Sequence, residues 1–167
     1  FKSLKKIHDG HFIHRYDITY ETVDGKEKVY EMISRNPDIS TLSELQAKTP
    51  DSVVLIMHDE KNEKILLNKE FRLALGDWVY NFPAGLIDEG EEPIESARRE
   101  LKEETGYTAE HFHYMGSINP SVAYTEEVIH LYAATGLIPG EADPDEDEAL
   151  ELVEYDFGEA YKMAASG

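Results

Sequence analysis

The order of hydrophobic and polar residues predicts a chain that begins with a β-hairpin. Two β-rich stretches, residues 12–20 and 28–33, flank the dipeptide Asp24-Gly25. Asp-Gly between such stretches is a strong hairpin signal, because both residues tolerate the positive φ of a tight turn. A polar stretch follows, so we expect residues 1–48 to form a small N-terminal antiparallel β unit.

Residues 49–167 are expected to form a larger domain. The continuous apolar run at residues 52–57 is typical of a buried strand, and residues 64–72 follow it as a hairpin partner. A helix begins at Pro93 and ends at Gly106, since proline favours the first turn of a helix and glycine the position after its last turn. The pattern also predicts a short helix at residues 42–47, strands at 112–117 and 128–134, and a helix at 157–164.

Strands with few, non-alternating helices favour the α+β class, in which helices pack on a mixed sheet. The length of 167 residues suits one such domain with a small appendage. A hydrophobic content of 41% is ordinary for a folded protein, so the chain has enough apolar residues for a sizeable core.

The charge of the chain limits what it is expected to bind. There are 35 acidic and 16 basic residues, and the formal net charge is −19. This charge disfavours nucleic acids and anionic membranes, which are bound through their phosphate field. The lack of cysteine excludes disulfides, thiolate zinc sites and cysteine nucleophiles. No apolar run approaches the roughly 20 residues that span a bilayer, and the N-terminus lacks a signal-peptide pattern, so we expect a cytoplasmic protein.

Three glutamates on the expected helix are the first sign of chemistry. Glu100, Glu103 and Glu104 are three and four residues apart, so their side chains share one helix face. Like charges so placed repel each other, and the helix dipole disfavours anions in the later half of a helix. The divalent cations Mg²⁺ and Mn²⁺ prefer such oxygen ligands and would offset this cost. The alternative interpretation is a solvated acidic face.

The neighbouring residues favour the metal site over the solvated face. Arg99 lies beside the cluster, and Glu91 precedes it where it can pair with that arginine. A loop at residues 81–90 leads into the helix and contains Gly85. Because glycine has no Cβ, the backbone at this position can approach an ion or a ligand closely.

The run from Gly85 to Tyr107 resembles the Nudix box, G-x5-E-x7-R-E-U-x-E-E-x-G-U, at every fixed position. The last position of the box, usually aliphatic, is the aromatic Tyr107. The resemblance implies a Nudix-type α/β/α sandwich in which the box forms a loop, a helix and a second loop. It also implies hydrolysis of a nucleoside diphosphate linked to another moiety, with Mg²⁺ or Mn²⁺ as the cofactor.

The resemblance also implies a role for each matching residue. Glu100 and Glu104 match the principal metal ligands of the family, and Glu103 matches a further ligand. The carbonyl of Ala84, just before the box, matches a backbone ligand. The residues that match positions supporting the site are Gly85, Glu91, Arg99 and Gly106.

The flanks of the box resemble the ADP-ribose pyrophosphatase branch of that family. Residues 67–72 end in an arginine as that branch's strand does, and residues 82–88 read F-P-A-G-L-I-D. This resemblance implies cleavage of ADP-ribose, or a similar nucleoside diphosphate sugar, into AMP and a sugar phosphate. GDP-sugar hydrolysis is an alternative, and a non-catalytic nucleotide-sugar sensor is an alternative of another class. Since members of the branch usually continue for a further helix or two, we expect the C-terminus at residue 167 to be incomplete.

Residues outside the box are expected to meet the substrate. Arg72 has a planar donor fork that suits phosphate oxygens, the alternative being a surface arginine at a strand end. In the downstream loop, Glu127 matches the candidate base of the branch, with Glu126 in reserve. Glu31 and Tyr16 in the hairpin are expected to line an adenine pocket across a homodimer, as in that branch; the alternative is packing.

Other conspicuous residues are expected to have ordinary structural roles. His111 and His113 share one face of an expected strand, but no third metal ligand accompanies them, so we expect them to be solvated or hydrogen-bonded. The lone Trp78 is expected in the core or in an interface. The acidic run at residues 141–148 lacks the spacing of a calcium loop, so we expect a solvated loop.

Overall fold

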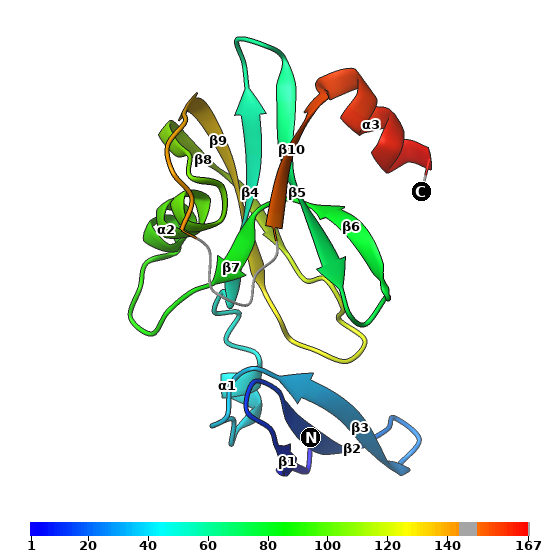
Figure 1. Cartoon of the computed structure of the whole chain (residues 1–167). Coiled ribbons are helices and arrows are strands. Elements are labelled where there is room, and N and C mark those ends of the chain that lie inside the picture. Colours follow the sequence, from blue (N-terminus) through cyan, green and yellow to red (C-terminus); the bar gives the residue numbers. More distant parts are fainter. Residues whose placement is uncertain (144–149, 167) are drawn as a thin grey trace. The chain divides into compact units, whose positions relative to one another are not determined.

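The computed structural model of the chain (Figure 1) describes residues 1–143 and 150–166. Most of the acidic run at residues 141–148, expected to be a solvated loop, lies outside these described residues. Within the two described ranges, no helix has the length and hydrophobicity that crossing a membrane requires.

The chain folds into two compact units. Unit 1 is formed by residues 1–51 and 118–129, and unit 2 by residues 52–117 and 130–167. The segment at residues 118–129 thus belongs with the N-terminal residues, although it lies far from them along the chain. The expected N-terminal unit does not include this segment, because only tertiary contacts reveal it.

Unit 1 contains an antiparallel sheet with the strand order β1-β2-β3. The predicted hairpin is confirmed as β2 (His14–Glu21) and β3 (Glu27–Ser34), joined by a turn in which Gly25 has a φ of 79°. The first strand, β1 (Ser3–Asp9), was not predicted. Nearly all of its side chains are exposed, so it lacks the apolar alternation by which a strand is recognised.

The core of unit 1 joins this sheet to the short helix α1 (Leu42–Leu45), which confirms the predicted helix. Tyr16 and Ile18 alternate on β2, and Tyr16 lies opposite Met32 of β3 in the strand register. This alternation places all three side chains on the buried face of the sheet. They pack with Ile39 and Leu45.

Unit 2 contains, among the residues that the structure describes, a seven-stranded mixed sheet with the order β10-β5-β4-β9-β8; β6 pairs with β5, and β7 with β4. The predicted strands are confirmed as β4 (Ser52–Asp59), β5 (Lys64–Arg72), β8 (Thr108–Ile118) and β9 (Ile129–Ile138). The strands that were not predicted are β6 (Asp77–Asn81), β7 (Ala84–Leu86) and β10 (Leu150–Asp156).

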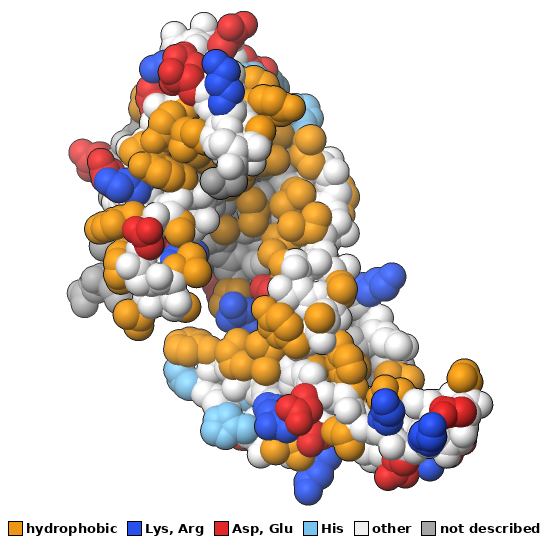
Figure 2. Space-filling view, turned by 90° about the vertical axis from the view of Figure 1, so that its right-hand side faces the viewer, with side chains coloured by type: hydrophobic (Ala, Val, Ile, Leu, Met, Phe, Trp, Pro, Cys, Tyr) orange, Lys and Arg blue, Asp and Glu red, His pale blue; other side chains and the backbone are white. Residues whose placement is uncertain are grey.

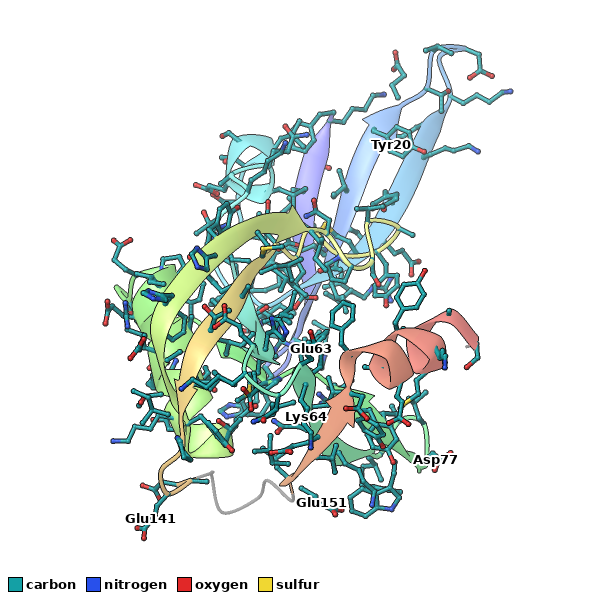
Figure 3. The ribbon with its side chains drawn as sticks, turned by 90° about the horizontal axis from the view of Figure 1, so that it is seen from above. Tyr20, Glu63, Lys64, Asp77, Glu141 and Glu151 are labelled. Carbon is teal, nitrogen blue, oxygen red and sulfur yellow. The ribbon has the colours of Figure 1, made fainter. Side chains whose placement is uncertain are left out.

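The unpredicted strands are short or rich in charge, and their partners stabilise them. In β10, acidic residues stand among apolar ones, and two of them pair with lysines of β5. Lys64 Nζ lies 3.1 Å from Glu154 Oε2, and Lys69 Nζ lies 3.0 Å from Glu151 Oε2. Figure 3 shows Lys64 and Glu151 on these neighbouring strands. This complementarity becomes visible only once the two strands are paired.

Two helices pack on the sheet of unit 2. The predicted helices are confirmed as α2 (Pro93–Thr105) and α3 (Phe157–Ser166). Figure 1 shows α2 beside β4 and β7, and α3 beside β10 and β5, in agreement with their contacts. Helix α2 buries Ala97 and Leu101 in the core, and the sheet residues that complete this core are Val53, Leu55, Met57, Leu66, Tyr132 and Ala134. The expected α+β class is confirmed.

Some large apolar side chains remain on the surface, as the orange areas of Figure 2 show. Trp78 of β6 is 49% exposed, so it is not the core residue that was one of its two expected roles. Its ring packs edge-on against Phe71 with 5.8 Å between the ring centroids. Lys69 Nζ lies 5.2 Å from the centroid of the indole, close enough for a cation–π contact.

Candidate active site

Helix α2 carries the candidate site, and its own sequence defines both its ends and its buried face. Pro93 occupies the first turn, and Gly106 ends the helix with a left-handed φ of 75°. Ser96 and Glu100 are one helical turn apart on its buried side, and Glu100 is only 9% exposed. A carboxylate so deeply placed requires compensation from neighbouring donors.

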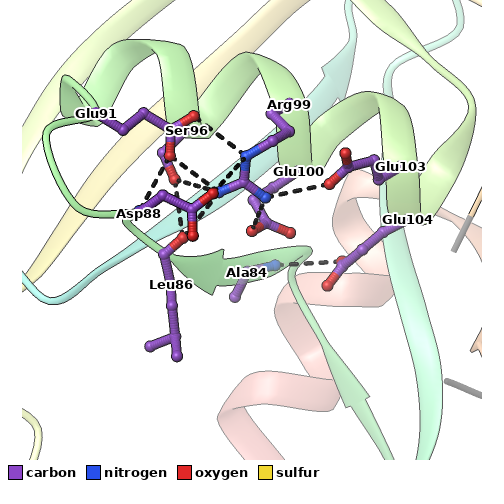
Figure 4. Close-up of polar contacts among 9 residues, drawn as sticks. All are labelled: Ala84, Leu86, Asp88, Glu91, Ser96, Arg99, Glu100, Glu103 and Glu104. Carbon is purple, nitrogen blue, oxygen red and sulfur yellow. Dashed lines mark hydrogen bonds and ion pairs between the residues drawn. The ribbon is translucent and has the colours of Figure 1, made fainter. Parts of the chain in front are cut away.

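Arg99 supplies much of that compensation (Figure 4). Its Nε donates to Glu91 Oε1 at 3.1 Å and its Nη2 to Glu91 Oε2 at 3.0 Å, a bidentate pair of the kind expected from the sequence. Its Nη1 donates to Glu100 Oε1 at 2.7 Å and to Glu103 Oε2 at 3.1 Å. The hydrogen bonds to Glu91, followed by those to Glu100, raise the pKa of Arg99, and Arg99 lowers the pKa of Glu91.

The same arginine joins the helix to strand β7. The carbonyl of Leu86 accepts from Arg99 Nη2 at 2.9 Å and from Ser96 Oγ at 3.2 Å. At the entry to the helix, Glu91 Oε2 accepts from the backbone N–H of Asp88 at 3.2 Å. These bonds hold the loop, the strand and the helix of the box as one rigid element.

Gly85 is required by its close approach to Glu100. A Cβ at this position would overlap the carboxylate of Glu100, so any larger residue would displace that side chain or β7. Gly85 does not lie in the left-handed region. The requirement is therefore steric rather than conformational, and it explains why the backbone before the helix can lie against a carboxylate.

Glu104 has a different set of partners. Its Oε2 accepts from Asn68 Nδ2 at 2.7 Å and from the backbone N–H of Ala84 at 3.3 Å. Glu104 lines one cavity of about 360 Å³ together with Ala84, Gly85, Leu86, Asp88, Arg99, Glu100 and Glu103. All four residues that the sequence assigned to the metal thus lie around a common space, together with two of the supporting residues, Gly85 and Arg99.

The residues around this cavity fit a divalent cation by their chemistry. In the described part of the chain, no group of three or more His, Asp or Glu side chains is already arranged to hold a metal ion. Glu100 and Glu103 instead accept hydrogen bonds from Arg99. The oxygen-only donors, gathered where Gly85 leaves room for a carboxylate, suit Mg²⁺ or Mn²⁺. A bound cation would compete with Arg99 for the same oxygens.

Arg72 lies at the end of β5. Because alternate residues of a strand share one face, Asn68, Glu70 and Arg72 point the same way. Arg72 follows Asn68, the residue that contacts Glu104, by four positions. The two residues therefore lie about 13 Å apart along the strand. Arg72 Nη2 pairs with Glu70 Oε2 at 2.9 Å, and its side chain is 55% exposed. Asn81 Nδ2 donates to the same oxygen at 3.1 Å, so Glu70 holds the arginine beside β6.

The residues expected to line an adenine pocket belong to unit 1. Tyr16 is fully buried in the core, and its hydroxyl donates to the carbonyl of Asn36 at 2.9 Å. Tyr16 is therefore a core residue in this structure and has no surface for a ligand. Glu31 has a side chain that is 67% exposed, and it pairs with Arg15 at 3.1 Å.

The segment at residues 118–129 is held to the edge of β3. The backbone N–H of Ile33 donates to the carbonyl of Tyr124 at 2.8 Å. The hydroxyl of Tyr30 donates to the carbonyl of Ala123 at 2.5 Å. These bonds form no part of any sequence motif, which is why the contact could not be predicted.

The two candidate bases of this segment differ in their surroundings. Glu126 Oε1 accepts from the buried hydroxyl of Ser34, while its Oε2 is buried without a hydrogen-bond partner among the described residues. Burial raises the pKa of Glu126, although the hydrogen bond from Ser34 opposes this effect. Glu127 Oε1 lies 3.8 Å from Arg35 Nε, and its side chain is 24% exposed.

We predict that Glu126→Gln raises the stability of the protein at neutral pH. A carboxyl whose pKa is raised on folding contributes stability that is present below its unfolded value of 4.5 and lost as the pH rises through the folded pKa. Glutamine avoids this loss, so the melting temperature at pH 8 should rise by about 2–4 °C, which corresponds to about 1 kcal/mol. Melting curves between pH 5 and pH 8 should show that the gain grows with pH.

The matched control is Glu127→Gln. Its carboxylate lies beside Arg35, so its replacement should bring no such gain. An equal gain in both variants, or a gain that does not depend on pH, would contradict the assignment to the buried oxygen of Glu126.

The fold and this site define a protein class, which comparison with known proteins supports. The family model described as the NUDIX domain matches residues 48–166. The chain therefore belongs to the Nudix hydrolase family. A crystal structure of an ADP compounds hydrolase superposes with a TM-score of 0.77 and 21% sequence identity, covering 98% of this chain and 81% of the other. At that identity the similarity concerns the fold alone, and it confirms the expected Nudix fold.

Two relatives are similar to this chain over most of its length. The ADP-ribose pyrophosphatase of Bacillus subtilis (strain 168) is 32% identical over 165 residues, which cover 97% of this chain and 80% of that protein. The methanol dehydrogenase activator of Bacillus methanolicus is 39% identical over 113 residues, which cover 66% of this chain and 60% of that protein. The matched region thus spans less than two thirds of the second relative.

Proposed function

We propose that this protein hydrolyses the diphosphate bond of ADP-ribose, or of a similar nucleoside diphosphate sugar, and releases AMP and a sugar phosphate. The observation that carries the proposal is the complete box, with Glu100, Glu103 and Glu104 around the cavity beside Gly85. The substrate class is supported by the 32% identity to an ADP-ribose pyrophosphatase over nearly the whole chain.

Each residue of the site has a part in this reaction. Glu100, Glu103, Glu104 and the carbonyl of Ala84 would hold Mg²⁺ or Mn²⁺. A divalent cation, when bound, neutralises charge on the diphosphate and makes water more nucleophilic. Glu127 is our candidate for the base that takes the proton from that water. The cation also explains how a chain with a net charge of −19 can bind an anionic substrate.

Product analysis with Mg²⁺ tests the proposal. The substrates to compare are ADP-ribose, GDP-mannose, NADH and a nucleoside triphosphate, with products identified by chromatography. AMP and ribose 5-phosphate from ADP-ribose is the expected result. Preferential cleavage of GDP-mannose would overturn the substrate class but not the chemistry. Tight binding of ADP-ribose without any product would instead indicate a sensor.

We further propose that the protein is a homodimer assembled through unit 1, as the branch resemblance implies. Exposed apolar residues on this unit support the proposal; Val29 of β3 is 55% exposed. The solution mass at micromolar concentration, from light scattering, is expected to be twice the chain mass of 19.0 kDa. A monomer at that concentration would contradict the proposal.

We predict that Arg72→Ala lowers kcat/KM for ADP-ribose by about 10–100-fold, since a charged hydrogen bond to substrate contributes about 1.5–3 kcal/mol. Arg72→Lys should recover only part of this loss, because an ammonium group keeps the charge but not the planar fork. Steady-state kinetics check both variants. Arg98→Ala is the control, since Arg98 lies 3.7 Å from Glu95 on the surface of α2. Equal effects in Arg72→Ala and Arg98→Ala would contradict a specific role.

A further inference from the structure

A buried amide lies next to the carboxylates of the box. Asn68 is only 2% exposed and sits in β5, directly after the buried run Ile65, Leu66 and Leu67. It lies inside the sheet, because it pairs in register with Asn81 of β6 on one side and Leu152 of β10 on the other. An apolar side chain would suit these surroundings, and burying an amide here costs stability.

The amide is only half satisfied. Its Nδ2 donates to Glu104 Oε2 at 2.7 Å, whereas its Oδ1 is buried without a hydrogen-bond partner among the described residues. The orientation follows from the chemistry of the pair, since an ionised carboxylate only accepts hydrogen bonds. The bond to Glu104 is thus made at the expense of the amide oxygen.

The bond from Asn68 restricts how the Glu104 carboxylate can turn. The backbone N–H of Ala84 donates to the same oxygen, Oε2, at 3.3 Å. One donor comes from β5 and the other from β7, and two donors on one oxygen from different strands limit rotation of the carboxylate about its last bond. Outer partners that orient a ligating carboxylate commonly raise the affinity of a site for its metal.

We propose that Asn68 is a positioning residue that orients Glu104 for the divalent cation. The inference rests on the proposed function, because it takes Glu104 as a metal ligand. It explains why β5 carries a buried, half-satisfied amide among apolar residues. Asn68 acts through Glu104 and does not itself touch the substrate.

The test is Mn²⁺ binding to the substrate-free protein, followed by electron paramagnetic resonance. In Asn68→Leu, whose side chain has the same branched arrangement of heavy atoms but no donor, the dissociation constant for Mn²⁺ is expected to rise by about 10–100-fold. The melting temperature in EDTA should stay the same or rise, because the buried polar group is gone. Asn68→Val, with a side chain suited to a strand, serves as the second variant if leucine prevents folding.

Asn62→Ala is the matched control. Asn62 Nδ2 also donates to a carboxylate, Asp59 Oδ2, at 2.7 Å, but on the turn after β4 and outside the box. Its replacement should leave Mn²⁺ affinity unchanged. Parental Mn²⁺ affinity in both Asn68 variants would overturn the inference. A parent protein that binds Mn²⁺ but does not hydrolyse ADP-ribose would overturn the proposed function alone, since the comparison of Mn²⁺ affinities needs no turnover.

Discussion

Replacing Glu104 with glutamine is expected to lower kcat with Mg²⁺ by about 10²–10³-fold, because loss of one charged ligand removes several kcal/mol of transition-state stabilisation. Folding should be preserved. The side-chain carbonyl of glutamine can still accept the hydrogen bonds from Asn68 Nδ2 and the Ala84 N–H that Glu104 accepts now. Steady-state kinetics and melting curves, each with Mg²⁺ and with EDTA, separate the two effects.

The control for this variant lies on the same helix. Glu95 has a side chain that is 62% exposed and lies 3.7 Å from Arg98, away from the cavity of the box. Glu95→Gln removes the same charge as Glu104→Gln, but outside the cavity. It should therefore leave kcat unchanged, and Mg²⁺ should still raise the melting temperature. Parental turnover in Glu104→Gln would remove Glu104 from the metal ligands, and equal losses in both variants would indicate a general charge effect.

The second large effect is expected from Gly85→Ala. The added Cβ would overlap the Glu100 carboxylate, so either β7 or Glu100 must move. Overpacking of this kind costs about 1–3 kcal/mol, and each kcal/mol lowers the melting temperature by roughly 2–4 °C. A displacement of about 1 Å at a catalytic group can lower turnover about 10²-fold, so kcat should fall as well.

Gly158→Ala is the matched control for the glycine variant. A Cβ at Gly158 meets nothing within 4 Å, and its φ does not lie in the left-handed region. Gly158→Ala should therefore leave kcat unchanged, and the melting temperature should stay the same or rise slightly. If Gly85→Ala kept parental turnover and stability, the close approach of Gly85 to Glu100 would have no functional weight.

Local signals in the sequence were enough for helix α2 and for the list of box residues. Pro93 and Gly106 act on the backbone of their own turns, and the spacing of Glu100, Glu103 and Glu104 decides their common face wherever the helix lies. The Arg99–Glu91 pair could be predicted for the same reason, because the two residues are eight positions apart across one helix start. Most of the long strands were also predictable from their apolar runs.

Other features depended on residues that are distant in sequence. Asn68 and Glu104 are 36 positions apart, and only the packing of α2 against the sheet brings them within 2.7 Å. In the same way, pairing in the core of unit 1 buries Tyr16, which the sequence had suggested for a ligand pocket. The unpredicted strands β6, β7 and β10 form because β4 and β5 offer unpaired backbone edges to them.

One physical reason separates the features that the sequence predicts from those that only the folded chain shows. A backbone dihedral or a helix periodicity is decided within a few residues, so the printed sequence is sufficient to identify the helix that carries the carboxylates. The partner of each side chain depends on which distant segments pack together. Only the folded chain therefore shows that Arg99 holds Glu100 and Glu103, that Asn68 holds Glu104, and that residues 118–129 belong with unit 1.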